Sequence, residues 1–137
     1  MKKLSIAVSL LALLAGGARA ETVGVSIVNF DNNFQTLLRL GLEARAGEVG
    51  VDVQMEDAQN DSAKQLDQIN NFIANGVDAI IVTLVDTAAS PAISRVAAEA
   101  GVPLVYVNLE PQDLSSLPAN QAYVGSNEIE SGTLGAF

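Results

Sequence analysis

Three glycines divide most of this chain into units of nearly equal length. Gly50, Gly76 and Gly101 lie 26 and 25 residues apart, and each is followed directly by valine. A glycine just beyond a helix can take the left-handed conformation that ends it. After each Gly-Val pair comes a run rich in apolar and β-branched residues, over 51–55, 79–82 and 104–107. The pattern predicts repeated helix-then-strand units, with another strand over 22–28.

The segments before these glycines have helical periodicity. The third helix is predicted to carry an apolar stripe of Ala89, Ala92, Ile93, Val96, Ala97 and Ala100. The second is predicted to carry a stripe of Ala63, Leu66, Ile69 and Ile73. The first helix is expected from near Phe34 to about Val49. Polar residues ahead of each helix are the expected N-caps: Asn32 or Asn33, Asn60 or Asp61, and Ser90 before Pro91.

The expected strands over 79–82 and 104–107 are apolar almost throughout. Such strands are typical of a parallel sheet covered by helices on both faces. A last strand over 122–124 and a helix from near Glu128 complete an order of β-α-β-α-β-α-β-loop-β-α. Right-handed crossovers then predict an α/β fold, an open, doubly wound and mostly parallel sheet with strand order 2-1-3-4-5.

The first 20 residues have the features of a secretory signal peptide. Two lysines are followed by the apolar run 4–15 and by Ala18-Arg19-Ala20, a small-x-small cleavage pattern ahead of Glu21. The run of 12 residues is shorter than the about 20 that a membrane span needs. These features lead us to expect export to the periplasm. A buried N-terminal helix is the alternative interpretation of the segment.

Charge and composition exclude several kinds of protein. Residues 21–137 hold four basic residues against 16 acidic ones, a formal charge of −12, which disfavours binding to nucleic acid or anionic membranes. The chain has no Cys and no His, so it lacks the commonest nucleophile, general base and metal ligands of catalytic sites. We expect no metal, no cofactor and no catalytic residue.

Ligands of open α/β sheets bind where strands end, so the loops after the strands are the informative ones. These loops are rich in amide, carboxylate and hydroxyl side chains, with Phe30 and Phe34 among them, over 29–34, 57–61, 83–87, 108–111 and 125–128. Neither G-x-G-x-x-G nor a Walker motif follows the first strand, which disfavours nucleotides. Amides and carboxylates pair with hydroxyls, and an aromatic ring packs on the apolar face of a sugar. This chemistry favours an uncharged polyol.

The same loops carry a family resemblance over about residues 22–137. The order and spacing of several stretches resemble the first lobe of type I periplasmic sugar-binding proteins, the ribose and galactose group of ABC transporter receptors: Asp31-Asn32-Asn33-Phe34, Asp57 to Asp61, Gln65 to Asn71, Gly76 to Ala79, Val85 to Ala89, Gly101 to Pro111 and Tyr123 to Asn127. The resemblance implies hydrogen bonds to sugar hydroxyls from Asn32 and Asn108, with Glu110 close by. It implies stacking of the ring on Phe34 and a hinge-proximal contact from Ser126.

This sequence departs from both known types of the family. The galactose type has Asp where Asn32 stands and Lys where Leu109 stands, and the ribose type has Asp-Arg at Asn108-Leu109. A pentose, a hexose or a cyclitol is therefore compatible with these loops.

Each of these residues also has a structural interpretation. Asn32 and Asn33 can cap the first helix, Phe34 can lie in its core and Asn108 can satisfy loop backbone groups. Residues 59–61 and the pair Asp86-Thr87 are interpreted as loop or cap residues. An acid–base pair of Asp86 and Glu110 is not expected, because nothing in the sequence sets their separation.

The resemblance also implies a domain organisation and partners. Residues 1–20 are the expected signal peptide, 21–125 the N-terminal ligand-binding lobe, and 126–137 the hinge and the start of a truncated second lobe. The implied partners are a monosaccharide or cyclitol, an ABC permease of the inner membrane and a chemoreceptor, for a monomeric protein. The alternatives are a secreted α/β enzyme, a LacI-type effector domain and a remnant that binds nothing. Half of a two-lobed site should bind its ligand weakly.

Overall fold

The computed structural model describes residues 20–126, and the predicted signal peptide up to residue 19 and the predicted helix from Glu128 lie outside them. Five strands form one parallel sheet in the order β2-β1-β3-β4-β5, as predicted. The elements are β1 (Thr22–Ile27), α1 (Asn33–Val49), β2 (Asp52–Asp57), α2 (Ser62–Ala74), β3 (Ala79–Val82), the short helix η1 (Thr87–Ala89), α3 (Ser90–Ala100), β4 (Leu104–Val107), the short helix η2 (Leu114–Ser116) and β5 (Gln121–Val124). None of the described helices is long and apolar enough to cross a membrane.

Caps and glycines set the helix ends largely as predicted. Asn32 caps α1 and Asp61 caps α2 through side-chain oxygens that accept backbone N–H bonds. Gly50, Gly76 and Gly101 all take positive φ, between 71° and 74°, beyond the three helices.

The predicted N-cap of the third helix is wrong. The short helix η1 runs straight into α3, so Ser90 is already helical, with φ −58° and ψ −38°. Its hydroxyl instead donates to the carbonyl of Thr87 and accepts from the N–H of Gln112. The residue before α3 is Ala89, which makes no side-chain cap bond, and Asp86 caps η1 by accepting from the N–H of Ala88.

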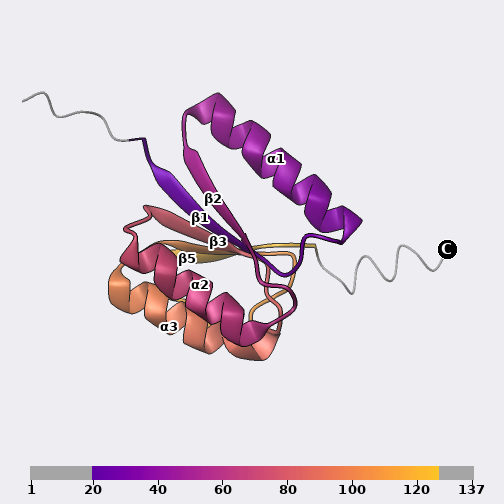
Figure 1. Cartoon of the computed structure of the whole chain (residues 1–137). Coiled ribbons are helices and arrows are strands. Elements are labelled where there is room, and N and C mark those ends of the chain that lie inside the picture. Colours follow the sequence, from indigo (N-terminus) through magenta and orange to yellow (C-terminus); the bar gives the residue numbers. More distant parts are fainter. Residues whose placement is uncertain (1–19, 127–137) are drawn as a thin grey trace, which may run out of the picture.

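One face of the sheet carries α2 and α3 (Figure 1). We call it the covered face: it holds the inward side chains of β3 and β4 and the apolar residues of both helices, namely Ile69, Phe72, Ile80, Val82, Ile93, Ala97, Leu104 and Tyr106, all at 0% exposure. Gly24 of β1 lies against Phe72, because a Cβ at Gly24 would be 2.5 Å from the ring. The helix therefore approaches the strand as closely as glycine allows.

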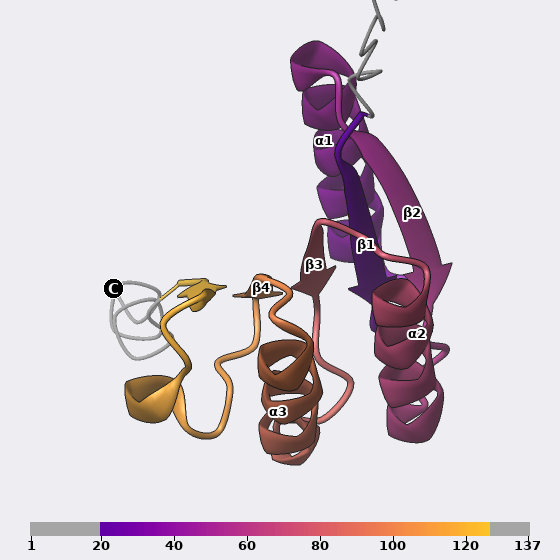
Figure 2. The same cartoon turned by 90° about the vertical axis from the view of Figure 1, so that its left-hand side faces the viewer.

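The opposite face has much less cover. Figure 2 shows α1 over β1 and β2, while no described helix lies on that side of β4 and β5. Val25 and Ile27 are buried there, but the apolar side chains farther along the sheet are half-buried or exposed: Ile81, Val105, Val107, Ala122 and Val124. We call these five residues the open face. Helices thus lie on both faces, as predicted, and within residues 20–126 the cover on the α1 side reaches only β1 and β2.

Candidate functional site

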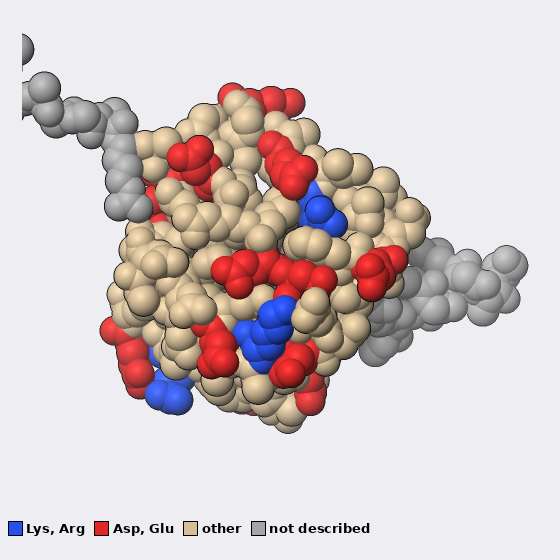
Figure 3. Space-filling model, viewed as in Figure 1, with Lys and Arg blue, Asp and Glu red and all other residues tan. Residues whose placement is uncertain are grey.

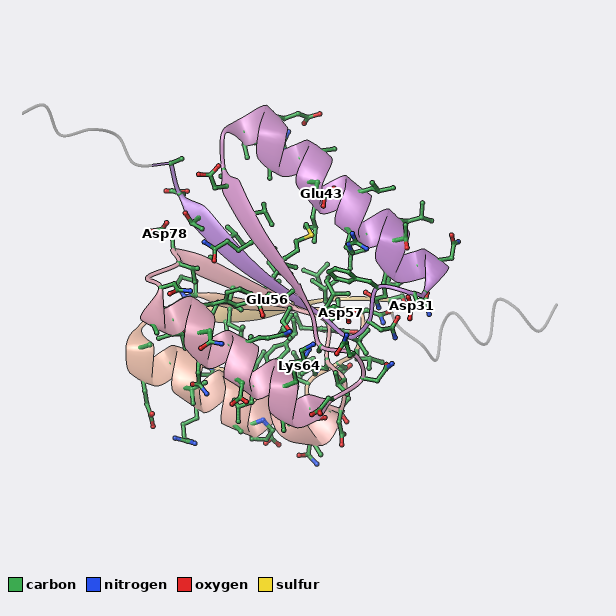
Figure 4. The ribbon with its side chains drawn as sticks, in the orientation of Figure 1. Asp31, Glu43, Glu56, Asp57, Lys64 and Asp78 are labelled. Atoms are coloured by element: carbon green, nitrogen blue, oxygen red, sulfur yellow. The ribbon has the colours of Figure 1, made fainter. Side chains whose placement is uncertain are left out.

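All the residues predicted to bind a ligand lie at the carboxyl edge of the sheet: Phe34 in the first turn of α1, and the others in the loops that follow β1, β4 and β5. Figure 4 shows Asp31 and Asp57 near this edge and Asp78 at the opposite one. β1 and β4 are separated by β3 alone, and two strand spacings amount to about 10 Å. Side chains from the loops after β1 and β4 can therefore approach one small molecule held above β3.

The loop after β1 presents an aromatic ring to solvent. Asn32 accepts the N–H of Phe34 at 2.8 Å through its side-chain oxygen, so its capping interpretation is correct. The amide nitrogen of Asn32 is not used by that bond and can donate to a ligand. Phe34 is 50% exposed, which excludes the core interpretation of this residue within the described chain.

The loop after β4 is held against the end of β5. The N–H of Asn108 donates to the carbonyl of Val124 at 2.9 Å, and the hydroxyl of Tyr123 donates to the carbonyl of Asn108 at 2.9 Å. Asn108 takes φ +76°, the left-handed region that non-glycine residues rarely adopt. These bonds satisfy the backbone of Asn108, and its half-buried side chain makes no hydrogen bond to the described residues.

The other two predicted site residues lie farther out. Glu110 is exposed and precedes Pro111, which is buried. Ser126 is exposed and lies two residues after the end of β5. Both lie at the same edge of the sheet as Asn32 and Asn108.

Two groups of polar residues at this edge have structural roles, as the sequence predicted. Asp86 caps η1, and Asp61 caps α2 by accepting from Ala63 and Lys64 at 2.8 and 3.0 Å. Gln59 and Asn60 form the left-handed turn between β2 and α2, with φ of 55° and 60°. These residues shape the edge.

Two buried glutamines of α2 hold the edge together. The Gln65 side chain donates to the carbonyl of Thr83 at 3.0 Å and accepts the N–H of Val85 at 3.0 Å, which fixes the chain as it leaves β3. Gln68 accepts the hydroxyl of Ser26 at 2.7 Å and donates to the carbonyl of Asp57 at 2.9 Å. The glutamines therefore tie the ends of β1, β2 and β3 to one helix.

Sequence analysis missed these glutamines. It predicted a stripe of Ala63, Leu66, Ile69 and Ile73 for α2, whereas the fully buried residues are Gln65, Gln68, Ile69 and Phe72. The helix is rotated so that the amides face the strand ends, and Ala63 is exposed. Two glutamines spaced i and i+3 beside Ile69 and Phe72 were the available signal, because that spacing places them on one helix side.

The electrostatic character of the described surface is acidic. Figure 3 shows Asp and Glu side chains outnumbering Lys and Arg on the face in view. Lys64 donates to the side-chain oxygen of Gln59 at 2.9 Å, and Arg39 stacks on Phe30 at 3.8 Å from the ring centre. Residues 20–126 hold no cluster of three side chains that could bind a metal ion. This surface favours a neutral or cationic ligand over an anion.

A hollow of about 240 Å³ opens beside the start of α3, away from the predicted residues. Its lining includes Ser90, Ser94, Arg95 and Asp113. The hydroxyls of Ser90 and Ser94 are already used, by Thr87 and Gln112 and by Tyr106. The hollow therefore offers few free hydrogen-bonding groups, and the carboxyl edge is the better candidate.

Known proteins are similar to this chain in sequence and in architecture. The chain is 56% identical over 135 residues to a protein of Rhizobium meliloti named as rhizopine-binding, covering 98% of this chain and 44% of the relative. It is 33% identical to a galactose-binding periplasmic protein of Haemophilus influenzae, over 98% of this chain and 41% of that one. A solute-binding protein of an ABC transporter from Bacillus halodurans, solved with bound myo-inositol, superposes with a TM-score of 0.71 at 31% identity, covering 88% of this chain and 44% of that chain.

These similarities confirm the predicted fold class and family. The chain spans less than half the length of the curated relatives described above. The relatives are named as binding proteins, in agreement with the expectation of binding without catalysis. Residues 23–136 match the family model described as a periplasmic binding protein domain. With its sheet order and its similarity to these relatives, this chain belongs to the periplasmic binding protein family.

Proposed function

We propose that this chain is the N-terminal ligand-binding lobe of a periplasmic substrate-binding protein that delivers a cyclitol or a monosaccharide to an ABC importer. The observation that carries the proposal is the placement of amide, carboxylate and aromatic side chains at one carboxyl edge, from loops after β1, β4 and β5. The relatives that bind galactose and myo-inositol support the ligand class.

In this proposal the ring of the ligand packs on Phe34, whose exposed face is available for it. The amides of Asn32 and Asn108 pair with ring hydroxyls, and Glu110 accepts from a further hydroxyl. Ser126 contacts the ligand near the hinge. Each neutral hydrogen bond contributes about 1 kcal/mol, and an unpaired buried partner costs about 1–3 kcal/mol. Discrimination between ring stereoisomers then comes from several such bonds together.

A cyclitol is the first choice of ligand. The solved structure with 31% identity holds myo-inositol, a neutral ring with hydroxyls on every carbon. The acidic surface and the absence of a free cation among the named site residues suit a ring without a carboxylate or phosphate. A pentose or hexose shares the hydroxyl chemistry and is the second choice.

The proposal extends to the organisation of the protein. Residues 1–20 act as the signal peptide that directs the chain to the periplasm, 21–125 form the lobe, and 126–137 contain the hinge and the start of a second lobe. The partners are the permease of the importer and, for signalling, a chemoreceptor. In the full receptor the two lobes close around the ligand, and the closed form delivers the ligand to the permease.

The test is a titration of the isotopically labelled chain with myo-inositol, ribose and galactose, followed by amide chemical shifts. We expect saturable shifts at 29–34 and 108–110, with a dissociation constant of about 1 mM, because one lobe supplies only part of the contacts. Shifts confined to other parts of the chain, or none with any of the three, would refute the proposal.

Matched variants sharpen this test. Phe34→Ala removes the stacking surface and should abolish the shifts, whereas Leu37→Ala, at an exposed apolar residue one turn later on α1, should leave them intact. Asn108→Gly keeps the left-handed backbone while removing the amide, and should weaken binding about fivefold for one lost hydrogen bond.

A further inference from the structure

The turn that follows β4 has an unusual backbone. The N–H of Leu109 donates to the carbonyl of Val107 at 3.1 Å, and Asn108 between them has φ +76°. A hydrogen bond across three residues with this φ at the centre defines the rare and strained form of the γ-turn. Strain of this kind persists only where surrounding contacts hold the backbone in place. The contacts of Asn108 are therefore informative.

Both backbone polar groups of Asn108 are bonded to β5. Its N–H donates to the carbonyl of Val124 at 2.9 Å, and its carbonyl accepts from the hydroxyl of Tyr123 at 2.9 Å. The ring of Tyr123 is partly buried and packs against the apolar core of the covered face. A side chain anchored in the core thus holds the far side of the strained turn.

Gly125 leaves the space that the Tyr123 hydroxyl occupies. A Cβ placed at Gly125 would overlap with the hydroxyl and with the ring carbon that carries it. Gly125 does not have the positive φ found at Gly50, Gly76 and Gly101, so backbone conformation does not explain a glycine here. The close approach of the Tyr123 hydroxyl does explain it.

We propose that Tyr123 is a positioning residue of the ligand site, which holds Asn108 in the γ-turn through its hydroxyl. The side chain of Asn108 is half-buried and makes no hydrogen bond to the described residues, so the backbone of the turn sets where the amide lies. Tyr123 then acts on the ligand through Asn108, without contact of its own, and Gly125 makes room for it. This inference rests on the proposed function.

Tyr123→Phe removes the hydroxyl and keeps the ring. We expect the affinity for myo-inositol, ribose or galactose, measured by the amide-shift titration, to fall about fivefold for one lost hydrogen bond. The matched control is Tyr106→Phe. Tyr106 pairs with Tyr123 in the register of β4 and β5, and its hydroxyl also donates to a carbonyl at 2.9 Å, that of Ser90. Its loss should leave the affinity within about twofold.

Amide hydrogen exchange tests the turn without a ligand. In Tyr123→Phe the exchange rate of Asn108, taken relative to that of Ile80 in the core, should rise about fivefold, because the turn opens more readily. Tyr106→Phe should leave this ratio unchanged. The ratio removes the effect of a general loss of stability, which would raise both rates together.

Asn108→Gly provides a test by rescue. Glycine adopts positive φ without the steric cost that a side chain brings, so the turn no longer depends on the Tyr123 hydroxyl. Adding Tyr123→Phe to Asn108→Gly should therefore change the exchange ratio of residue 108 by less than about twofold. A change as large as in the unaltered background would show that the hydroxyl does not act through the strain at Asn108.

A second variant displaces the hydroxyl without removing it. Gly125→Ala should weaken sugar binding and raise the exchange ratio of Asn108 as Tyr123→Phe does, because the new Cβ takes the place of the hydroxyl. Gly41→Ala, at a glycine of α1 with nothing near its Cβ position, should do neither. Circular dichroism of each variant shows that it is folded.

The outcomes separate the two proposals. Failure of all three sugars to bind the unchanged chain refutes the proposed function, and the exchange ratio still decides whether Tyr123 holds the turn. If the unchanged chain binds a sugar and Tyr123→Phe binds it equally well, this inference alone is overturned. Equal losses of affinity in Tyr123→Phe and Tyr106→Phe would also overturn it, because they would reflect general destabilisation.

Discussion

The two faces of the sheet are built from the same strands, but the described helices cover them to different extents. On β4 the alternating residues Leu104 and Tyr106 have no exposure, while Val105 and Val107, which alternate with them, are half-buried. Both sets are apolar, so composition does not distinguish them. The difference lies in which helices of residues 20–126 pack on each face. The covered face holds the larger set of fully buried apolar side chains, so substitutions there should cost more stability.

The strongest test of this comparison is the aromatic core of the covered face. Phe72→Ala should lower the free energy of unfolding by about 3–5 kcal/mol, because a fully buried ring leaves a cavity against Gly24. Leu37→Ala on the exposed side of α1 should change it by no more than about 0.5 kcal/mol. Urea denaturation followed by circular dichroism measures both. Equal losses would mean that α1 and α2 are packed alike.

Neighbouring residues of one strand give a closer comparison. Leu104→Ala should cost about 2–5 kcal/mol, whereas Val105→Ala, one residue along on the opposite face, should cost about 1 kcal/mol or less. The same denaturation measurement applies. A Val105 loss as large as that of Leu104 would show that the open face is already covered in solution.

The glutamine contacts on the covered side can be broken without removing apolar volume. Gln65→Leu leaves the carbonyl of Thr83 and the N–H of Val85 without partners and should cost about 1–3 kcal/mol. Faster hydrogen exchange at Val85 should accompany the loss. The control is Gln54→Leu, an exposed glutamine of β2. Unchanged exchange at Val85 would show that Gln65 does not hold this loop.

The smallest expected effect is a pH dependence from Tyr106. Burial raises the pKa of its phenol above the usual 10.0, against the opposing effect of hydrogen bonds from Ser94. Above pH 10 the unfolded chain loses this proton while the folded chain keeps it, so the free energy of unfolding should fall as pH rises. Denaturation at pH 9 to 11 measures the slope. Tyr106→Phe should remove this contribution, and Tyr123→Phe should retain it.

The sequence predicted those features that depend on local patterns. The strands over 79–82 and 104–107 were predicted to the residue, and the glycine spacing located the C-terminal ends of α1, α2 and α3 to within about one residue. Caps such as Asn32 and Asp61 act within two or three residues, so they too are visible in sequence. The family resemblance and the strand order placed Asn32, Phe34 and Asn108 at one edge.

Features that depend on distant partners were not predictable in this way. Gln68 bonds to Ser26, which is 42 residues away, and the spacing of Gln65 and Gln68 on one helix side does not identify that partner. The strand β2 runs through Glu56 and Asp57, beyond the expected end at Met55, because pairing with β1 overrides their low strand propensity.

The left-handed backbone at Asn108 limits how this family member can change its ligand preference. Glycine, asparagine and aspartate tolerate that conformation, whereas β-branched and bulky residues pay a steric penalty. A mutational path to a new sugar can therefore replace the amide of Asn108 with the carboxylate of aspartate, or remove the side chain with glycine. It has little access to larger side chains at this position. The geometry of one peptide unit thus narrows the evolutionary choices at the edge of the sheet.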